Sequence, residues 1–224
     1  MSAQPQGPDT GPASEDAALL TLTQWLSPAF PLGSFAYSHG LETAIAEGHV
    51  SDAAGLEAWL GYVLCFGTGR SDAILIHACL RGEPVDDLAT LARALAPSAE
   101  RAREAEEQGA ALARTIGALR GTTMPPRPLP VAFGAAARRL PVAPLRVVAL
   151  YLQAFVGNLV SCATRAVPLG QTEAQAVLAR LSQPILTTAS ATAETPVGRI
   201  SSAAFGSDLS ALRHETQDVR LYRT

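Results

Sequence analysis

The sequence predicts an all-α protein, a single multi-helix domain of roughly eight to ten helices around one central hydrophobic helix. Alanine and leucine are abundant, whereas the alternating runs of valine, isoleucine and threonine that are typical of strands are nearly absent. A chain of 224 residues, 48% hydrophobic and 17% charged, is long and apolar enough to bury one substantial core. Apolar residues recur at helical spacing in each long segment, which again favours helices.

The N-terminal composition and the overall charge indicate whether the protein is secreted and which partners it can bind. Residues 1–13 are rich in Gly, Pro and Gln and show no basic patch before an apolar run, so we expect a flexible tail without a secretory signal. The helical domain is expected to cover residues 14–224. A net charge of −3 and a pI near 5.8 provide no basic surface for nucleic acid or an anionic membrane, and neither is expected as a partner.

The three cysteines indicate the cellular compartment in which the protein is expected. Cys65, Cys79 and Cys162 lie far apart in apolar segments and form no C-x-x-C pair. Such cysteines are typical of buried thiols in a reducing environment, so we expect a cytoplasmic protein.

The first helix is expected from Ser14 to Leu26, and Pro28 ends it. The stretch of residues 25–42 holds two prolines, two glycines and four aromatic residues, although the chain is only 5% aromatic. Prolines restrict the backbone and Gly33 permits a left-handed turn, so this stretch predicts a shaped loop.

Beyond this loop, helical spacing predicts a helix from Ser34 to Gly48. On this helix, His39 and Glu42 would share one face, a turn apart. Because no third ligand or nucleophile lies nearby, the pair is interpreted as hydrogen-bonded polar residues rather than as a catalytic or metal site.

The next four helices are predicted from caps, breaks and apolar spacing. They are expected after a cap at Ser51 or Asp52 and then over Arg70–Arg81, Val85–Leu95 and Ser98–Leu119. In the last of them, residues 100–107 mix both charges at helical spacing, which indicates a solvent-exposed face with ion pairs.

A proline-rich loop, residues 121–130, is expected to cross the surface in an extended form within the same domain. A short helix follows it, and Pro144 then opens the longest helix, residues 145–166. This helix should be the central one, and its polar residues argue against a membrane span. Two more helices are expected over residues 172–181 and 184–194.

The last segment, residues 203–224, should contain a short helix capped by Ser207. It carries apolar anchors and three arginines, yet it is too short to form a core of its own. We therefore expect it to be mobile in the isolated protein and to become ordered against a partner.

Several short motifs in this sequence resemble those of one known family. Residues 27–42, Ser-Pro-Ala-Phe-Pro-Leu-Gly-Ser-Phe-Ala-Tyr-Ser-His-Gly-Leu-Glu, resemble without a gap the N-terminal signature of the urease accessory protein F family (UreF). Shorter similar words occur at Glu100-Arg101 with Gln108-Gly109, at Pro130 to Gly134, at Tyr151 to Thr172, and at His214 to Arg223. The resemblance is weakest in the proline-rich loop and the N-terminal tail.

The resemblance implies a non-enzymatic, all-helical protein that forms a homodimer within a larger complex. It implies that the protein links a UreD/UreH-type accessory protein and the UreG GTPase to nickel delivery into apo-urease. The sequence itself shows no P-loop, no G-x-S-x-G and no H-E-x-x-H, so no catalytic residue is expected. The assembled complex would handle nickel, and no cofactor is expected as a tight ligand of this chain.

Candidate partner-binding residues lie in the signature and in the C-terminal segment. They are Phe30, Phe35, Tyr37, Ser38, His39, Glu42, Phe205, Arg213, His214, Glu215, Arg220, Tyr222 and Arg223. Arginines suited to assist a GTPase are Arg70, Arg165, Arg220 and Arg223, although gating of the GTPase is favoured over direct catalysis.

An alternative hypothesis is a helical-bundle nickel carrier with its own metal site. Its ligands would come from His39, Glu42, Cys65 and His77. Bundle metal sites normally repeat a Glu-x-x-His word on several helices, and this chain has none.

Overall fold

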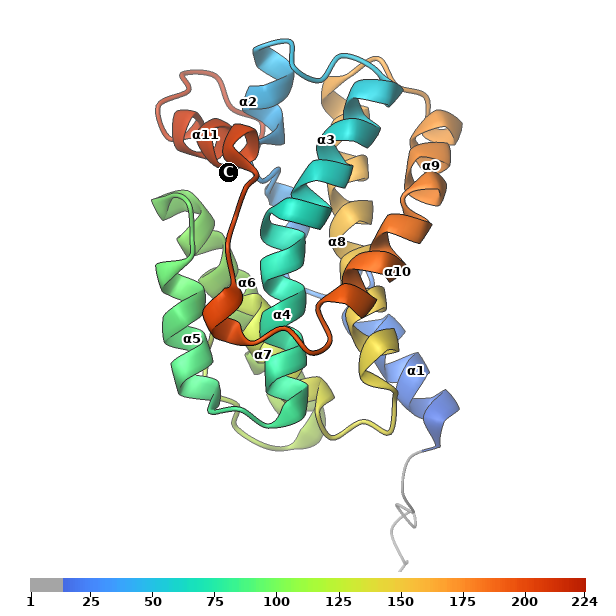
Figure 1. The fold of residues 1–224 in the computed structure, drawn as a ribbon, viewed down its shortest axis with the longest axis vertical. Coiled ribbons are helices and arrows are strands. Elements are labelled where there is room, and N and C mark those ends of the chain that lie inside the picture. Colours follow the sequence, from blue (N-terminus) through green and yellow to red (C-terminus); the bar gives the residue numbers. More distant parts are fainter. Residues whose placement is uncertain (1–13) are drawn as a thin grey trace, which may run out of the picture.

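A computed structural model describes residues 14–224, and every regular element in this part of the chain is helical, which confirms the all-α prediction. The helices pack side by side as an elongated bundle (Figure 1). The predicted N-terminal tail, residues 1–13, lies outside the described residues. In chain order the elements are α1 (Glu15–Trp25), η1 (a 3-10 turn, Ser34–Ala36), α2 (Leu41–Ala46), α3 (Ala53–Phe66), α4 (Thr68–Arg81), α5 (Val85–Ala94), α6 (Ala99–Arg120), α7 (Leu129–Ala137), α8 (Pro144–Ala166), α9 (Gln171–Arg180), α10 (Ser182–Ala191), η2 (a 3-10 turn, Val197–Arg199) and α11 (Phe205–His214).

Several helix starts follow from residues that the sequence singled out. The side chain of Asp52 accepts a hydrogen bond from the backbone of Gly55 at 2.8 Å and caps α3. Ser98 caps α6 in the same way, at 3.2 Å from the backbone nitrogen of Arg101. Pro144 occupies the first turn of α8, where its missing N–H costs nothing.

Helix α8 is the central element, as predicted. It packs against α1, α2, α3, α4, α9 and α10. Its inward side chains, Val148, Leu152 and Val156 among them, are fully buried. This helix and the stretch Ala53–Arg81 have the length and hydropathy of a membrane span, but 50% and 61% of their apolar windows are buried inside the protein. Burial in the helical core accounts for their apolar character.

The helix predicted over Ser34 to Gly48 is interrupted, and this prediction was wrong. The 3-10 turn η1 gives way to extended backbone at Tyr37. His39 (φ 57°) and Gly40 (φ 76°) then both adopt left-handed conformations. Two left-handed residues cannot continue a right-handed helix, so α2 begins only at Leu41.

The proline-rich loop is packed closely on α6. A Cβ atom on Gly109 would lie 1.9 Å from the carbonyl oxygen of Arg127, and one on Gly117 would lie 2.6 Å from that of Thr122. Glycines at these two helical positions let the loop backbone approach α6. The loop ends where α7 starts, at Leu129.

The segment between α10 and α11 crosses the outside of α3 and α4 (Figure 1). The backbone of Ala203 donates to the carbonyl of Phe66 at 2.9 Å, and the hydroxyl of Tyr62 donates to the carbonyl of Ala203 at 2.6 Å. Helix α11 begins at Phe205, two residues before the predicted cap Ser207.

Candidate functional site

The segment of residues 215–224, which we call the strap, folds back onto the signature segment (residues 27–42) and α6. The backbone nitrogen of Ser38 donates to the backbone oxygen of Thr224 at 2.8 Å. The hydroxyl of Thr224 donates to Glu104 of α6 at 2.8 Å. Tyr222 is buried, and its hydroxyl donates to the carbonyl of Cys162 in α8 at 3.0 Å. The strap is therefore joined to three separate parts of the body.

Glu42 is the anchor for the middle of the strap. Its carboxylate accepts hydrogen bonds from the backbone nitrogens of Leu221 at 2.6 Å and Tyr222 at 3.0 Å. It also lies 3.1 Å from Nε2 of His214, the fully buried last residue of α11. The other ring nitrogen of His214 lies 2.7 Å from Glu100. The ring therefore bridges α2 and α6.

Tyr37 and Arg223 form a second contact between the signature segment and the strap. The hydroxyl of Tyr37 donates to Glu107 at 2.6 Å, and Arg223 donates to both groups, at 3.1 and 3.0 Å. The guanidinium also lies over the Tyr37 ring, 5.6 Å from its centre. Burial, together with the hydrogen bond to Glu107, raises the pKa of Tyr37 to about 12, so the phenol stays protonated as a donor.

Beneath the strap lies a buried charged cluster. Glu104 is 2% exposed, contacts Arg101, lies 2.8 Å from Nε2 of His39 and accepts from Gln108 at 3.0 Å. Burial alone would raise the pKa of Glu104, but Arg101 and His39 outweigh it and lower that pKa to about 2. Glu104 is therefore an anion that several donors share.

His39 is held in an unfavourable conformation by this cluster. A left-handed backbone costs a non-glycine residue roughly 1–2 kcal/mol and persists where surrounding contacts enforce it. Burial, and secondarily the charge of Arg101, lowers the pKa of the His39 ring, which favours a neutral imidazole. Nε2 of His39 lies 2.8 Å from Glu104 and 3.1 Å from Arg101. Nδ1 is buried and has no hydrogen-bond partner among residues 14–224.

A cavity of about 500 Å³ that is partly open to solvent borders the same cluster. Its lining includes His39, Glu104, Asp72 and Tyr151. Tyr151 donates to Asp72 at 2.6 Å, yet burial still raises the pKa of Asp72 to about 6. The cavity therefore combines apolar walls with a few buried polar groups.

Two predictions about charged residues are corrected here. His39 and Glu42 do not pair with each other, because the left-handed break places them on different sides of the backbone: His39 contacts Glu104, and Glu42 holds the strap. Residues 100–107 are not simply a solvent-exposed face, since Arg101 and Glu104 are buried. Sequence reasoning missed Glu100, Glu104 and Glu107 as the acceptors of the site. Their spacing on one face of α6 was the available signal.

The predicted partner-binding residues separate into two sets. The strap region gathers eight of them, namely Tyr37, Ser38, Glu42, His214, Glu215, Arg220, Tyr222 and Arg223, with His39 beneath. Outside it, Phe30 is in the core, Arg213 pairs with Glu47 at 3.0 Å, and Phe35 and Phe205 are 64% and 75% exposed. Partner binding by these residues stays a prediction.

The C-terminal segment has a defined position in the structure, and its mobility in the isolated protein stays a prediction. Residues 215–224 pack on their own helical body, because Glu42, Ser38 and Glu104 satisfy the strap's backbone and hydroxyl groups. The arginines meet carboxylates of the same chain, such as Arg220 with Glu100 at 2.7 Å.

The residues of the alternative metal site do not come together. His77 lies 2.9 Å from the carbonyl of Ala189, Cys65 lies 3.6 Å from the hydroxyl of Thr188, and Glu42 holds the strap. Within residues 14–224, no three His, Cys, Asp or Glu side chains are grouped as metal ligands would be.

Comparison with known proteins gives a consistent result. A family model described as UreF matches residues 50–182. The chain is 61% identical over 208 residues to the urease accessory protein UreF of Cereibacter sphaeroides (strain KD131), a match that covers 93% of this chain and 99% of that protein. The UreF proteins of Dinoroseobacter shibae and Paracoccus denitrificans are 49% and 46% identical, covering 93% of this chain and 99% and 97% of theirs.

Proposed function

The chain belongs to the UreF family of urease accessory proteins, and from this premise we propose that it is a cytoplasmic scaffold for maturation of the urease nickel centre. Its partners would be a UreD/UreH-type accessory protein, the UreG GTPase and apo-urease. An accessory protein is not the catalyst, and the proposed role is to hold these proteins together while nickel is delivered.

The observation that carries this proposal is a set of apolar side chains exposed on α11 and the strap. Phe205 and Leu221 are 75% and 70% exposed, and Val219 is also exposed. Large apolar side chains grouped on a surface with arginines nearby are typical of protein interfaces. Arg220 and Arg223 lie on the same segment, exposed beside these side chains. This surface is suited to a partner that offers apolar pockets and carboxylates.

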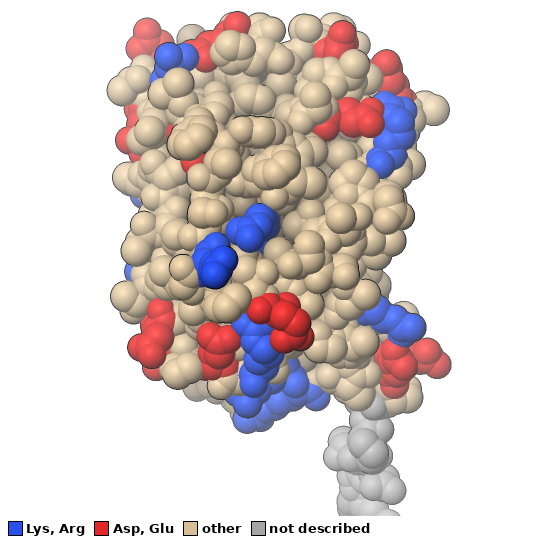
Figure 2. All heavy atoms as spheres, viewed as in Figure 1, with Lys and Arg blue, Asp and Glu red and all other residues tan. Residues whose placement is uncertain are grey.

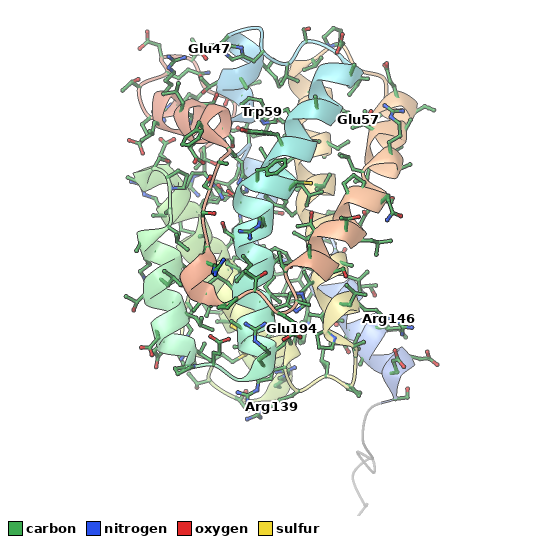
Figure 3. All side chains as sticks on the ribbon, in the orientation of Figure 1. Glu47, Glu57, Trp59, Arg139, Arg146 and Glu194 are labelled. Carbon is green, nitrogen blue, oxygen red and sulfur yellow. The ribbon has the colours of Figure 1, made fainter. Side chains whose placement is uncertain are left out.

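An adjoining uncharged face supports assembly with further copies or partners. Trp59 of α3 lies beside α11, with a ring atom 3.8 Å from where a Cβ on Gly206 would lie (Figure 3). Tyr62 and Phe66 continue this face along α3, with their rings 5.5 Å apart and half-exposed. On this side of the molecule most charged side chains lie near the edges (Figure 2). We assign the homodimer contact to this face of α3, beside α11.

The proposed effect on UreG is gating rather than donation of a catalytic arginine. Arg220 and Arg223 are engaged with Glu100 and Glu107 of the same chain. Arg165 is exposed and borders the pocket. An arginine that assists GTP hydrolysis has to reach the phosphates, and Arg220 and Arg223 would first have to leave these carboxylates.

A pull-down with the UreD/UreH-type protein tests the proposal. Phe205→Ala removes the most exposed aromatic ring on α11, whereas Leu20→Ala removes a similarly exposed (72%) apolar side chain on α1 as the matched control. We expect Phe205→Ala to weaken binding by about tenfold or more and Leu20→Ala to have little effect. Equal binding by both variants and the unchanged chain would contradict the proposed surface.

A further inference from the structure

Arginines gather where three neighbouring helices end, at the lower end of the bundle in Figure 1. Helix α4 ends at Arg81, α6 ends at Arg120, and α7 is followed directly by Arg138 and Arg139. Figure 3 labels Arg139 at this end of the molecule, and Figure 2 shows basic side chains gathered there. Cations near helix C-termini offset the helix dipole, which accounts for an arginine at each end. The dipole does not account for a missing acidic partner.

Arg120 and Arg139 are two like charges that lack such a partner. At the same end of the bundle, Arg81 is paired with Glu83 at 2.8 Å. Among residues 14–224, neither Arg120 nor Arg139 forms an ion pair. Burial, and secondarily the charge of Arg139, lowers the pKa of the Arg120 guanidinium, so the two side chains are close enough to repel each other. An anion that meets both guanidinium groups relieves this repulsion.

Arg120 is held in place by uncharged groups. Its guanidinium lies over the ring of the buried Trp25, 5.0 Å from the ring centre. One of its nitrogens donates to the carbonyl of Ala136 at 3.3 Å. The side chain is nevertheless exposed, and most of its five N–H donors remain for a ligand. A guanidinium that is already oriented loses little conformational freedom when it binds a carboxylate in forked geometry.

A hollow of about 380 Å³ adjoins Arg120 on the side of the signature segment. Its lining includes Phe30 and Pro31 of that segment and Leu119 of α6. Leu119 directly precedes Arg120 and is 61% exposed. An apolar hollow beside oriented arginines is suited to a protein segment in which an apolar side chain adjoins acidic ones. A small inorganic anion would meet the arginines but leave the hollow unfilled.

We propose that Arg120, Arg139 and this hollow form a docking site for an acidic segment of a partner protein. A carboxylate of that segment bridges the two guanidinium groups, and a neighbouring apolar side chain enters the hollow beside Leu119. The net charge of −3 favours an acidic protein segment over nucleic acid, which binds chiefly through an extended basic surface.

This docking site is separate from the face proposed above on α11 and the strap. Helix α11 lies at the upper end of the bundle in Figure 1, whereas α6 and α7 end at the lower end. A protein bound at one end leaves the other end uncovered, so the chain can hold two partners at once. The inference goes beyond the proposed role in urease maturation, and its test uses no urease protein.

The experiment measures binding of a fluorescein-labelled peptide, Glu-Glu-Leu-Glu-Glu, to the full chain by fluorescence anisotropy. The matched peptide Gln-Gln-Leu-Gln-Gln lacks the carboxylates. The site is removed by Arg120→Gln with Arg139→Gln. The matched control is Arg103→Gln with Arg114→Gln, which changes the net charge equally at two exposed arginines of α6 that also form no ion pair among residues 14–224.

The docking site predicts that the chain binds the glutamate peptide more tightly than the glutamine peptide. Arg120→Gln with Arg139→Gln should weaken this binding by about tenfold or more, and the control pair by no more than about twofold. Leu119→Ala should weaken it by about threefold, because the leucine of the peptide loses part of its apolar contact. Arg139→Gln alone should also weaken it, and this exposed side chain forms no hydrogen bond or ion pair that the fold needs, which keeps the test decisive if Arg120→Gln does not fold.

Three results would overturn the proposal. The first is equal binding of the two peptides, or no binding of the glutamate peptide. The second is an equal loss of binding in the two double variants, which would reflect general charge attraction without a site. The third is displacement of the glutamate peptide by inorganic phosphate together with an unchanged affinity for Leu119→Ala, which would identify a small-anion site in place of a docking site for a protein segment.

Discussion

Replacing Gly109 with alanine should destabilise the protein, although the same change at most exposed helical positions is stabilising. Gly109 lies inside α6, where the proline-rich loop crosses it. An added Cβ would meet the carbonyl oxygen of Arg127 at 1.9 Å and the backbone nitrogen of Leu129 at 2.7 Å. These are backbone atoms, so the loop as a whole has to move.

The magnitude follows from two opposing terms. Alanine gains up to about 1 kcal/mol of helix propensity over glycine. Overpacking a close contact costs about 1–3 kcal/mol and sometimes more, and a backbone overlap of this depth lies at the upper end. The expected net loss is roughly 2 kcal/mol, which lowers Tm by roughly 4–8 °C in a domain of this size.

Thermal unfolding followed by circular dichroism measures the effect, with Gly61→Ala as the matched control. Gly61 is also inside a helix, α3, but its nearest outside atom to an added Cβ is a methyl group of Leu181 at 3.8 Å. Gly61→Ala should therefore raise Tm by a few degrees, through helix propensity alone. If Gly109→Ala were as stable as Gly61→Ala, the close packing of the loop on α6 would be refuted.

Three further predictions concern the buried cluster, nickel and the GTPase. The pKa of Glu104 falls from its ordinary 4.5 to about 2 in the folded protein, so its ionised form stabilises the fold above pH 4.5. That contribution, roughly 3 kcal/mol, is lost as the pH falls towards 2. The free energy of unfolding in urea should therefore depend less on pH for Glu104→Gln than for the unchanged chain, and an equal pH dependence would contradict the assignment. Equilibrium dialysis of the isolated chain against micromolar nickel should show no stoichiometric binding, whereas one tightly bound ion per chain would revive the carrier hypothesis. Arg223→Ala should change the rate of GTP hydrolysis by UreG only a few-fold, since we expect gating; a loss of orders of magnitude would instead identify a catalytic arginine.

The sequence was sufficient to predict the helical framework. Helical spacing around Leu152 and the proline at position 144 identified the central helix, and Asp52 and Ser98 identified two helix starts. These are local signals, since a cap or an apolar stripe depends on residues within one or two turns. The long helices were predictable for that reason.

The candidate site was only partly predictable, because its determinants are distant in the chain. The left-handed conformation of His39 is enforced by Arg101 and Glu104, more than sixty residues later. The burial of Glu104 depends on Thr224, 120 residues further along. A charge pattern at helical spacing is the same on an exposed face and on a face that a later segment covers. The signature and the strap were singled out by their residues, but their contact with each other was not.

We propose that this chain is required for nickel to reach urease. The most direct measurement is the nickel content of urease purified from cells that express apo-urease with the UreD/UreH-type and UreG proteins, with or without this chain. We expect nickel and urease activity near background without the chain, restoration with the unchanged chain or Leu20→Ala, and poor restoration with Phe205→Ala. Full nickel loading of urease in the absence of this chain would contradict the account.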